Sequence, residues 1–221
     1  MNILIVNDDG ISSKRINILR ECLKKFGNVY VCVPNSERSG NSHATKKYDI
    51  LEKNFFKINE EENTYVHNCT ASDSIKFFLK FVRKDIDLVI SGINQGFNLG
   101  TDIVYSGTVG AALEANMHGI KSIALSAKKD FDNYLFELPR LFNFLFNKFD
   151  WGKIMCLNIN FPDKPIEMPF KYKVVPIAQI KRTTIGDNDY NMCRNHGYAT
   201  ISPLRVDLTD YENLNAIKIG G

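Results

Sequence analysis

The chain begins Met1-Asn2-Ile3-Leu4-Ile5-Val6 and then breaks into Asn7-Asp8-Asp9-Gly10. A short apolar run rich in branched residues predicts a buried strand, and the Asp-Gly step predicts a sharp turn after it. Asp8 and Asp9 therefore follow the end of the first strand. Because ligands of open parallel sheets bind at the carboxyl ends of the strands, we expect a functional site at this edge.

The acidic pair has two interpretations. In the first it belongs to a polar turn, and one Asp caps the helix that follows. In the second it holds a divalent cation, because two adjacent carboxylates repel each other and a cation keeps both ionised. The repulsion favours the second interpretation.

The segments after the turn alternate between helical and strand patterns. Residues 12–26 carry apolar side chains at helical spacing, and Gly27 then precedes a strand at 29–33, which makes a parallel βαβ unit. Further buried strands are predicted at 87–91, 122–126 and 155–160. This alternation predicts a layered α/β fold with a mostly parallel sheet.

Two pieces interrupt or extend this pattern. Residues 49–66 show short alternating runs that predict a small antiparallel insertion, and Thr70 with Asp73 predicts the cap of a helix to residue 81. Beyond Pro162, strand-like pieces at 170–178 and 198–202 flank a polar span, and a helix is predicted at 208–217. We expect residues 1–162 to form the catalytic core and 163–221 a β-hairpin arm that needs a partner subunit for stability.

Composition excludes several classes of protein. The 221 residues are 44% hydrophobic and 24% charged, with a net charge of +3 that is too small and too scattered to predict a nucleic-acid polymer as partner. No run approaches the roughly 20 apolar residues of a membrane span. Five cysteines without a Cys-x-x-Cys pair, and a first strand that leaves no room for a leader, predict a reduced, cytoplasmic protein.

Two polar loops follow predicted strands. The loop that contains Ser39 and Gly40 is dense in hydroxyls and amides, so it supplies oxygen ligands to the cation or is a solvated turn. In Gly92-Ile93-Asn94-Gln95-Gly96-Phe97-Asn98-Leu99-Gly100 the glycines allow close backbone approach to a ligand, and Asn94 and Asn98 offer an oxygen to a metal or an amide to an oxyanion. The alternative is a flexible glycine loop. The spacing matches neither a dinucleotide nor a P-loop motif.

Ser106-Gly107-Thr108 opens a helix of small residues. Free backbone N–H groups and hydroxyls at a helix N-terminus form an anion site, so this segment is a candidate phosphate cradle. An ordinary N-cap is the alternative.

These motifs, in this order, resemble those of the SurE survival proteins. The similarity is carried by Asn7-Asp8-Asp9-Gly10, Glu37-Arg38-Ser39-Gly40, the glycine-asparagine stretch and Tyr105-Ser106-Gly107-Thr108. It implies a divalent-metal-dependent phosphatase of nucleoside monophosphates, with a three-layer α/β/α Rossmann-like core and an arm exchanged between subunits of a homodimer or homotetramer. Carried over by position, the metal ligands are Asp8, Asp9, Ser39 and Asn94. The segment between Pro162 and Gly197 is shorter than is usual in the family.

The expected chemistry is attack of an activated water on the phosphate. An all-oxygen ligand set suits Mg²⁺ and Mn²⁺ alike, and 3′-nucleotides and short polyphosphates remain open as substrates. The candidate catalytic residues are Asp8, Asn98 and Ser106, and the candidate substrate-binding residues are Ser39, Gly40, Asn98, Ser106, Gly107 and Thr108. The alternatives are phosphoaspartyl transfer, which the adjacent carboxylates disfavour, and a non-enzymatic receiver-like module that binds metal and phosphate.

Overall fold

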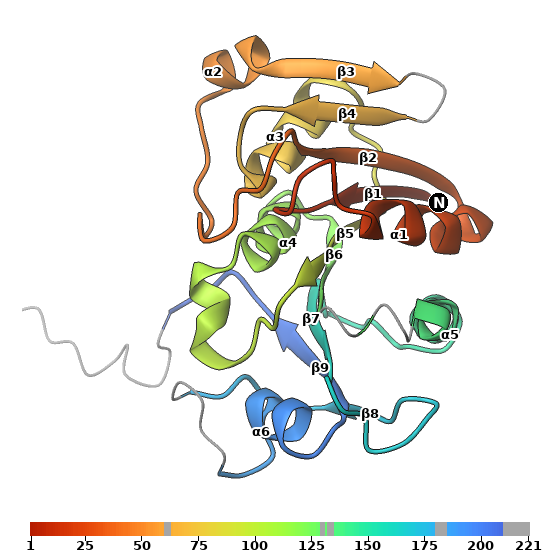
Figure 1. Ribbon diagram of the computed structural model, residues 1–221. Helices are drawn as coiled ribbons and strands as arrows, with labels where there is room; N and C mark the ends of the chain where they lie inside the picture. Colours follow the sequence, from red (N-terminus) through yellow and green to blue (C-terminus); the bar gives the residue numbers. More distant parts are fainter. Residues whose placement is uncertain (60–62, 129–130, 132–134, 180–184, 210–221) are drawn as a thin grey trace, which may run out of the picture.

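The first strand lies near the middle of a nine-stranded sheet with the order β3-β4-β2-β1-β5-β6-β7-β9-β8. The computed structural model describes residues 1–59, 63–128, 131, 135–179 and 185–209 (Figure 1). The five central strands all run parallel to one another. They are β2 (Asn28–Pro34), β1 (Asn2–Val6), β5 (Leu88–Gln95), β6 (Lys121–Ala127) and β7 (Cys156–Phe161). The predicted parallel core is confirmed.

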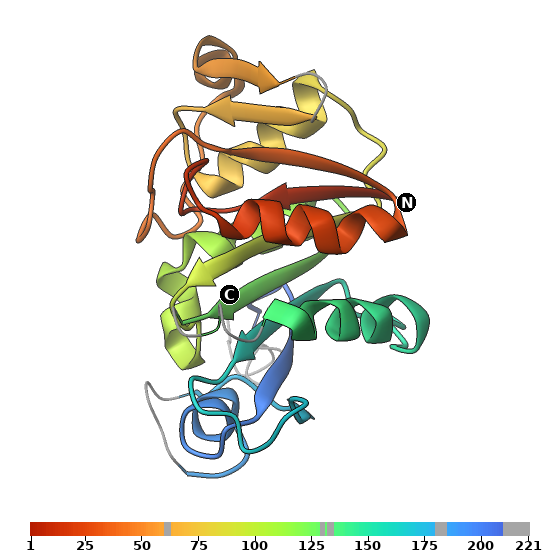
Figure 2. The ribbon, with the colours of Figure 1, turned by 45° about the vertical axis from the view of Figure 1, so that its right-hand side comes forward.

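Helices cover both faces of this sheet. Figures 1 and 2 show α1 (Arg15–Leu23) and α5 (Leu138–Asn147) on one face, and α3 (Ala71–Phe81) and α4 (Gly107–Met117) on the other. Alternation along β1 explains this arrangement, because successive side chains of a strand point to opposite faces. Ile3 and Ile5 pack in the core cluster of α1 and α5, whereas Leu4 and Val6 pack in that of α3 and α4. The fold is therefore the expected three-layer α/β/α type.

Short elements complete the first half of the chain. α1 continues into the 3-10 helix η1 (Lys24–Phe26), and a second one, η2 (Gly100–Tyr105), precedes α4. α2 (Tyr48–Lys53) leads into β3 (Phe55–Asn59) and β4 (Thr64–His67), which pair antiparallel as predicted. Thr70 and Asp73 form the predicted capping box of α3.

The C-terminal region differs from the prediction. β8 (Tyr172–Val174) and β9 (Ala199–Leu204) are parallel, and β9 pairs antiparallel with β7. The predicted β-hairpin is therefore wrong, because hairpin strands are antiparallel and these two are joined through α6 (Asp189–Arg194). β9 joins the core sheet because Ala199 and Ile201 are buried in the cluster around α5.

α6 lies within the polar span that was expected to be a loop, and the side chain of Asn188 caps it by accepting from the backbone N–H of Asn191. The helix expected at 208–217 falls almost entirely outside the described residues. Among the helices that the structure describes, none has the length and apolarity needed to cross a membrane.

Candidate active site

The acidic pair leaves β1 in a turn that neither carboxylate builds. Oδ1 of Asn7 accepts from the backbone N–H of Gly10 at 3.1 Å, and Nδ2 of Asn7 donates to the Gly10 carbonyl at 3.2 Å. Lys14 is the N-cap residue of α1, with no side-chain capping bond from a described residue. The segment is thus the expected polar turn, but Asp8 and Asp9 are not helix caps.

Asp8 is packed against the start of α4. Its side chain is 4% exposed, and its Oδ1 accepts from the Thr108 hydroxyl at 2.7 Å. A Cβ at Gly107 would lie only 2.8 Å from Oδ2 of Asp8, so any larger residue at this position would displace the carboxylate. Burial raises the pKa of Asp8, and the Thr108 hydrogen bond opposes that rise.

Asp9 is held in a site that disfavours its negative charge. Burial, followed by repulsion from Asp8, raises the pKa of Asp9 to about 6. Its buried Oδ2 has no hydrogen-bond partner among the described residues. An orphaned carboxylate oxygen beside a second carboxylate fits a divalent cation, which supplies the missing positive charge.

The remaining predicted ligands lie beside this pair. Asp8, Ser39, Gly40, Asn94, Asn98 and Ser106 all line one cavity of about 260 Å³. Asp9 lines an adjacent cavity of about 660 Å³, which shares Ser39 and Asn94 with the first. In the described part of the chain, no cluster of three or more His, Cys, Asp or Glu side chains suits a metal. A cation here would therefore need the hydroxyl of Ser39 and the amide oxygen of Asn94 as well as the carboxylates.

Ser106 is both a helix cap and a cavity residue. Its Oγ accepts from the backbone N–H of Val109 at 3.1 Å, which confirms the N-cap interpretation. The same hydroxyl keeps its own hydrogen to donate, so capping does not prevent contact with an anion.

Thr108 differs from its expected place. Its side chain is fully buried, and its hydroxyl donates to Asp8 instead of facing the cavity that Ser106 lines. The Thr108 hydroxyl is therefore unavailable to a phosphate, and it positions Asp8. Gly107 likewise contributes by its closeness to Asp8.

Asn98 is fixed by a buried network of amides. Its backbone N–H donates to Oδ1 of Asn160 at 2.9 Å, and its carbonyl accepts from the amides of Asn158 and Asn160. Its own Nδ2 donates to Oγ of Ser126 at 2.7 Å. Because that nitrogen carries two hydrogens, one remains for an anion in the cavity.

Two buried charged residues escaped the sequence analysis. Arg15 is 2% exposed and donates to the carbonyls of Asn94 at 3.0 Å, Ala127 at 2.9 Å and Lys128 at 2.7 Å. It ties α1 to the carboxyl ends of β5 and β6. The predicted helix contains several other basic residues, so the sequence does not distinguish Arg15 as a buried one.

Asp189 has a corresponding role at the other end of the glycine-asparagine stretch. Its carboxylate accepts from the backbone N–H of Gly100 at 2.8 Å and of Ala178 at 2.9 Å. It joins the C-terminal region to the loop that follows β5. No local pattern in the sequence indicates a contact across 89 residues.

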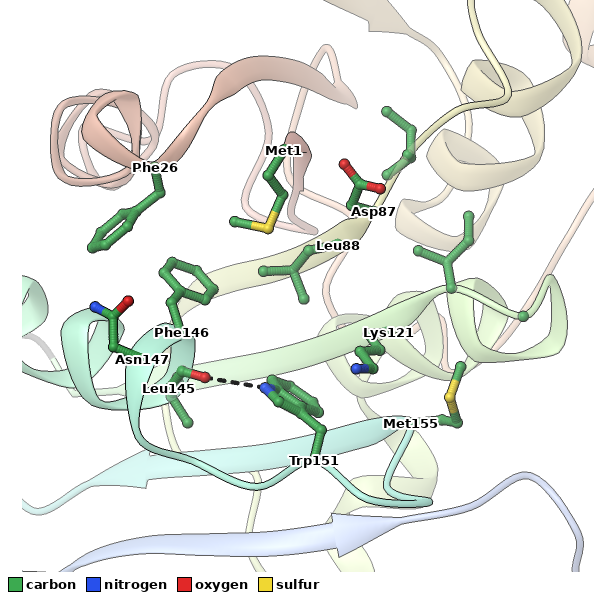
Figure 3. Close-up of a pocket in the computed structure, with 13 residues that line it drawn as sticks. Met1, Phe26, Asp87, Leu88, Lys121, Leu145, Phe146, Asn147, Trp151 and Met155 are labelled. Atoms are coloured by element: carbon green, nitrogen blue, oxygen red, sulfur yellow. Dashed lines mark hydrogen bonds between the residues drawn. The ribbon is translucent and has the colours of Figure 1, made fainter.

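A larger cavity, of about 970 Å³, lies at the opposite edge of the sheet. Figure 3 shows Phe26, Phe146 and Trp151 around it, with Met1 and Lys121 at the amino ends of their strands. Its walls are mainly apolar, whereas the carboxyl edge gathers carboxylates, hydroxyls and amides. The chemistry of the lining residues, and not the volume of the cavity, therefore identifies the candidate active site.

Comparison with known proteins agrees with the predicted resemblance. The family model for the survival protein SurE matches residues 3–191. The 5′-nucleotidase SurE of Wolbachia pipientis subsp. Culex pipiens is 35% identical, over 99% of this chain and 93% of its own length. The 5′-nucleotidase SurE of Petrotoga mobilis is 35% identical, over 99% of this chain and 98% of its own length.

A solved structure agrees as well. The SurE protein from Aquifex aeolicus superposes with a TM-score of 0.83 at 30% identity, over 98% of both chains. Family, fold and the order of the motifs coincide along nearly the whole sequence, and this chain therefore belongs to the SurE family.

Proposed function

We propose that this protein hydrolyses the phosphate ester of nucleoside 5′-monophosphates, with a divalent cation held by Asp8, Asp9, Ser39 and Asn94. The nucleotidase activity follows from the family, whose relatives across nearly the full chain are 5′-nucleotidases. One observation carries the rest of the proposal. The orphaned Oδ2 of Asp9 lies beside a second buried carboxylate, next to a cavity lined by donors for an anion.

The donor set is all oxygen, which suits Mg²⁺ or Mn²⁺. Such a cation supplies Lewis-acid polarisation of the phosphoryl group and eases the deprotonation of water. The chain contributes the placement of its ligands. Arg15 fixes the backbone at Asn94, and the backbone N–H of Arg38 donates to the Asp8 carbonyl at 2.7 Å, next to Ser39.

Residues of the chain accept the proton and bind the phosphate. The Thr108 hydroxyl donates to Oδ1 of Asp8, and the other oxygen of that carboxylate is assigned to accept the proton of the attacking water. Ser106 and the second amide hydrogen of Asn98 donate to the phosphate oxygens, where negative charge increases in the transition state. Gly40 lines the same cavity and lets the backbone of its loop approach the phosphate.

The test is release of inorganic phosphate from a panel of nucleotides with Mg²⁺, Mn²⁺ or a chelator. The panel contains 5′- and 3′-monophosphates and short polyphosphate, and Mn²⁺ binding is measured separately by calorimetry. We expect turnover of 5′-monophosphates only with a metal. Metal binding without turnover of any substrate would contradict the proposal and favour a receiver-like binding module.

We further propose a homodimer or homotetramer whose interface is formed by the exposed parts of residues 163–221; β9 pairs with β7 of its own chain, so the whole arm is not exchanged. The support is apolar exposure in this region, where Val174, Ile185 and Leu208 are 64%, 84% and 93% exposed. The five cysteines are free thiols, of which four are buried, and this fits a reducing compartment, so we place the protein in the cytoplasm.

A further inference from the structure

The loop between β2 and α2 carries Ser39 and Gly40, and it is anchored on both sides of them. On one side, the backbone N–H of Arg38 donates to the Asp8 carbonyl at 2.7 Å. On the other side, Ser42 donates to η2, through its backbone N–H to Tyr105 at 3.2 Å and through its hydroxyl to Val104 at 2.6 Å. Ser39 is therefore suspended between two attachment points.

Next to Ser42, the loop also contacts α4, the helix whose N-terminus forms part of the candidate phosphate site. Nε2 of His43 donates to Oε2 of Glu114 in α4 at 2.7 Å. The loop backbone touches α4 directly, since a Cβ at Gly110 would lie 2.8 Å from the Ser42 carbonyl oxygen and 2.9 Å from Cα of His43. α4 thus contributes to the site in two ways: Ser106 at its N-terminus lines the cavity, and Glu114 on its side binds the loop that carries Ser39.

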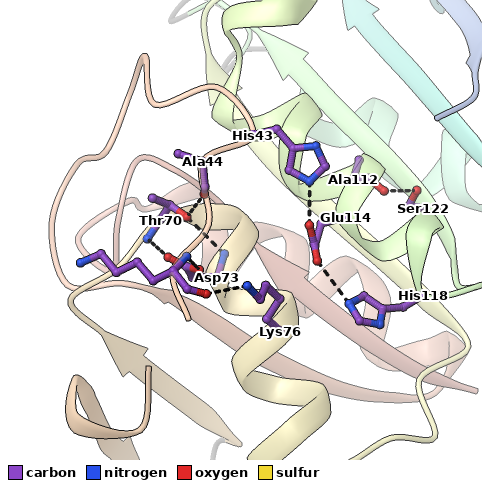
Figure 4. Close-up of polar contacts among 10 residues, drawn as sticks. His43, Ala44, Thr70, Asp73, Lys76, Ala112, Glu114, His118 and Ser122 are labelled. Atoms are coloured by element: carbon purple, nitrogen blue, oxygen red, sulfur yellow. Dashed lines mark hydrogen bonds and ion pairs between the residues drawn. The ribbon is translucent and has the colours of Figure 1, made fainter. Parts of the chain in front are cut away.

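The side chain of Glu114 is also held in place by a contact that does not involve the loop. It is 7% exposed, and its other oxygen accepts from Nε2 of His118, one turn along the same helix, at 3.2 Å. Figure 4 shows the two histidines pointing at the carboxylate from opposite sides. A carboxylate fixed in this way loses little freedom when His43 binds it.

The end of the loop is attached to a different helix. The Thr70 hydroxyl donates to the Ala44 carbonyl at 2.7 Å, and the backbone N–H of Lys46 donates to Oδ1 of Asp73 at 2.7 Å. These contacts hold the loop near α3, beyond His43. They leave the His43–Glu114 contact as the side-chain tie between the loop and α4 in the part of the chain that is described.

We propose that His43 and Glu114 are positioning residues that hold Ser39 and Gly40 over the acidic pair. This inference rests on the proposed function, because it assumes that Ser39 is a metal ligand. Neither residue lines the cavity of the site. Their effect is exerted through the loop. Loss of the contact frees the loop from α4 and leaves only the Ser42 bonds to η2 and the later bonds to α3 on that side of Ser39, which weakens both metal binding and catalysis.

The test compares His43→Leu with His43→Gln, which keeps an N–H donor of similar reach. His118→Leu is the control, since it removes the other partner of Glu114 without touching the loop. Hydrogen exchange at residues 38–44 and the Mn²⁺ dissociation constant are both measured without substrate, and kcat and KM are measured at saturating Mn²⁺. For His43→Leu we expect both faster exchange and a dissociation constant raised about tenfold, the size that follows from losing one hydrogen bond to a charged group. His43→Gln should recover most of the loss.

Wild-type exchange and Mn²⁺ affinity in His43→Leu would overturn the inference, as would an equal effect of His118→Leu. Glu114→Gln gives an independent second variant if His43→Leu does not fold, and the double variant should be no worse than either single one. If the wild type hydrolyses no nucleotide, the proposed function fails. The exchange and metal measurements still decide whether the contact positions the loop.

Discussion

At the scale of single residues, the site concentrates unfavourable charge. Asp8 and Asp9 are both in surroundings that raise the pKa, chiefly by burial, and Asp9 is affected further by its neighbour. Thr108 opposes this rise at Asp8. At Asp9 the charge of Arg15 and a backbone hydrogen bond from Gln95 oppose it in part, and Oδ2 still has no donor within the described residues. In the metal-free protein the ionised carboxylates are therefore destabilising, and a bound cation would relieve this destabilisation.

The raised pKa of Asp9 predicts how the stability of the metal-free protein depends on pH. With a pKa of about 6 in the folded protein, against an ordinary value of 3.8, Asp9 binds more protons folded than unfolded between these limits. Its contribution to the free energy of unfolding therefore falls as pH rises from about 4 to about 6. Urea unfolding of wild type and Asp9→Asn in a chelator, at several pH values, measures this. The difference between the two proteins should shift in favour of Asp9→Asn as pH rises.

Asp9→Asn should also separate folding from activity. We expect turnover to fall at least about 100-fold, because a charged ligand is lost, while the metal-free protein melts no lower than wild type. Added Mn²⁺ should raise the melting temperature of wild type and leave that of the variant nearly unchanged. Near-native turnover at saturating metal would remove Asp9 from the ligand set.

Thr108→Val tests the assignment of Thr108 to Asp8. Loss of the hydroxyl removes a hydrogen bond that lowers the pKa of Asp8, so that pKa should rise. The acid limb of the activity profile should move to higher pH, and turnover should fall roughly tenfold or more. Thr108→Ser should behave as wild type. A rise in KM alone, with no movement of the pH profile, would instead indicate direct contact with the phosphate.

At the scale of elements, Arg15 ties α1, β5 and β6 together at the edge where the site lies. Its planar guanidinium reaches three carbonyl oxygens, which the ammonium of a lysine cannot match in geometry. Arg20, on the same helix, donates to the hydroxyl of Thr64 at 2.6 Å and lies beside β4. The two arginines offer a natural comparison between a buried contact at the site and one away from it.

Arg15→Met should destabilise the protein by about 3 kcal/mol, because buried carbonyls lose their donors. It should also weaken Mn²⁺ binding, since the backbone at Asn94 is released. Arg20→Met is the matched control, and we expect it to lower stability without changing metal affinity. Denaturant unfolding and calorimetry of both variants separate the two effects.

The elements also show why only part of this structure follows from the sequence. Most strands and helices of residues 1–127 and the capping box were predictable because apolar periodicity and caps are local signals, but α2 lies where strand-like runs were expected. The parallel pairing of β8 with β9 was not, since it depends on β9 joining β7. The acidic pair, Ser106 and Asn98 were found because each follows a strand or opens a helix. The positions of Arg15 and Asp189 depend on contacts far along the chain.

At the scale of the whole molecule, β9 lies between β7 and β8, so the C-terminal region is part of the core sheet. Removing residues 171–221 would expose the edge of β7 and the apolar surface beneath Ile201. We expect the truncated protein to be insoluble, because an unpaired edge and an apolar patch promote aggregation. A soluble, active fragment would show that the rest of the sheet folds independently.

For the full chain we expect light scattering to return at least twice the monomer mass of 25.2 kDa at micromolar concentration. A symmetric, obligate interface of about 2,000 Å² or more does not dissociate measurably in that range. A monomeric mass across dilutions and ionic strengths would contradict the proposed assembly.

The contact between Asp189 and Gly100 has a consequence for how the protein is made. The N-terminal part of a chain emerges from the ribosome first, and domains begin to fold as they emerge. The acidic pair, the Ser39 loop and α4 would all be outside the ribosome well before Asp189 is synthesised. The loop after β5 acquires its anchor only with α6, and β7 acquires its outer neighbour only with β9. The nascent enzyme should therefore remain inactive until residues up to 204 have emerged, and become competent late in translation.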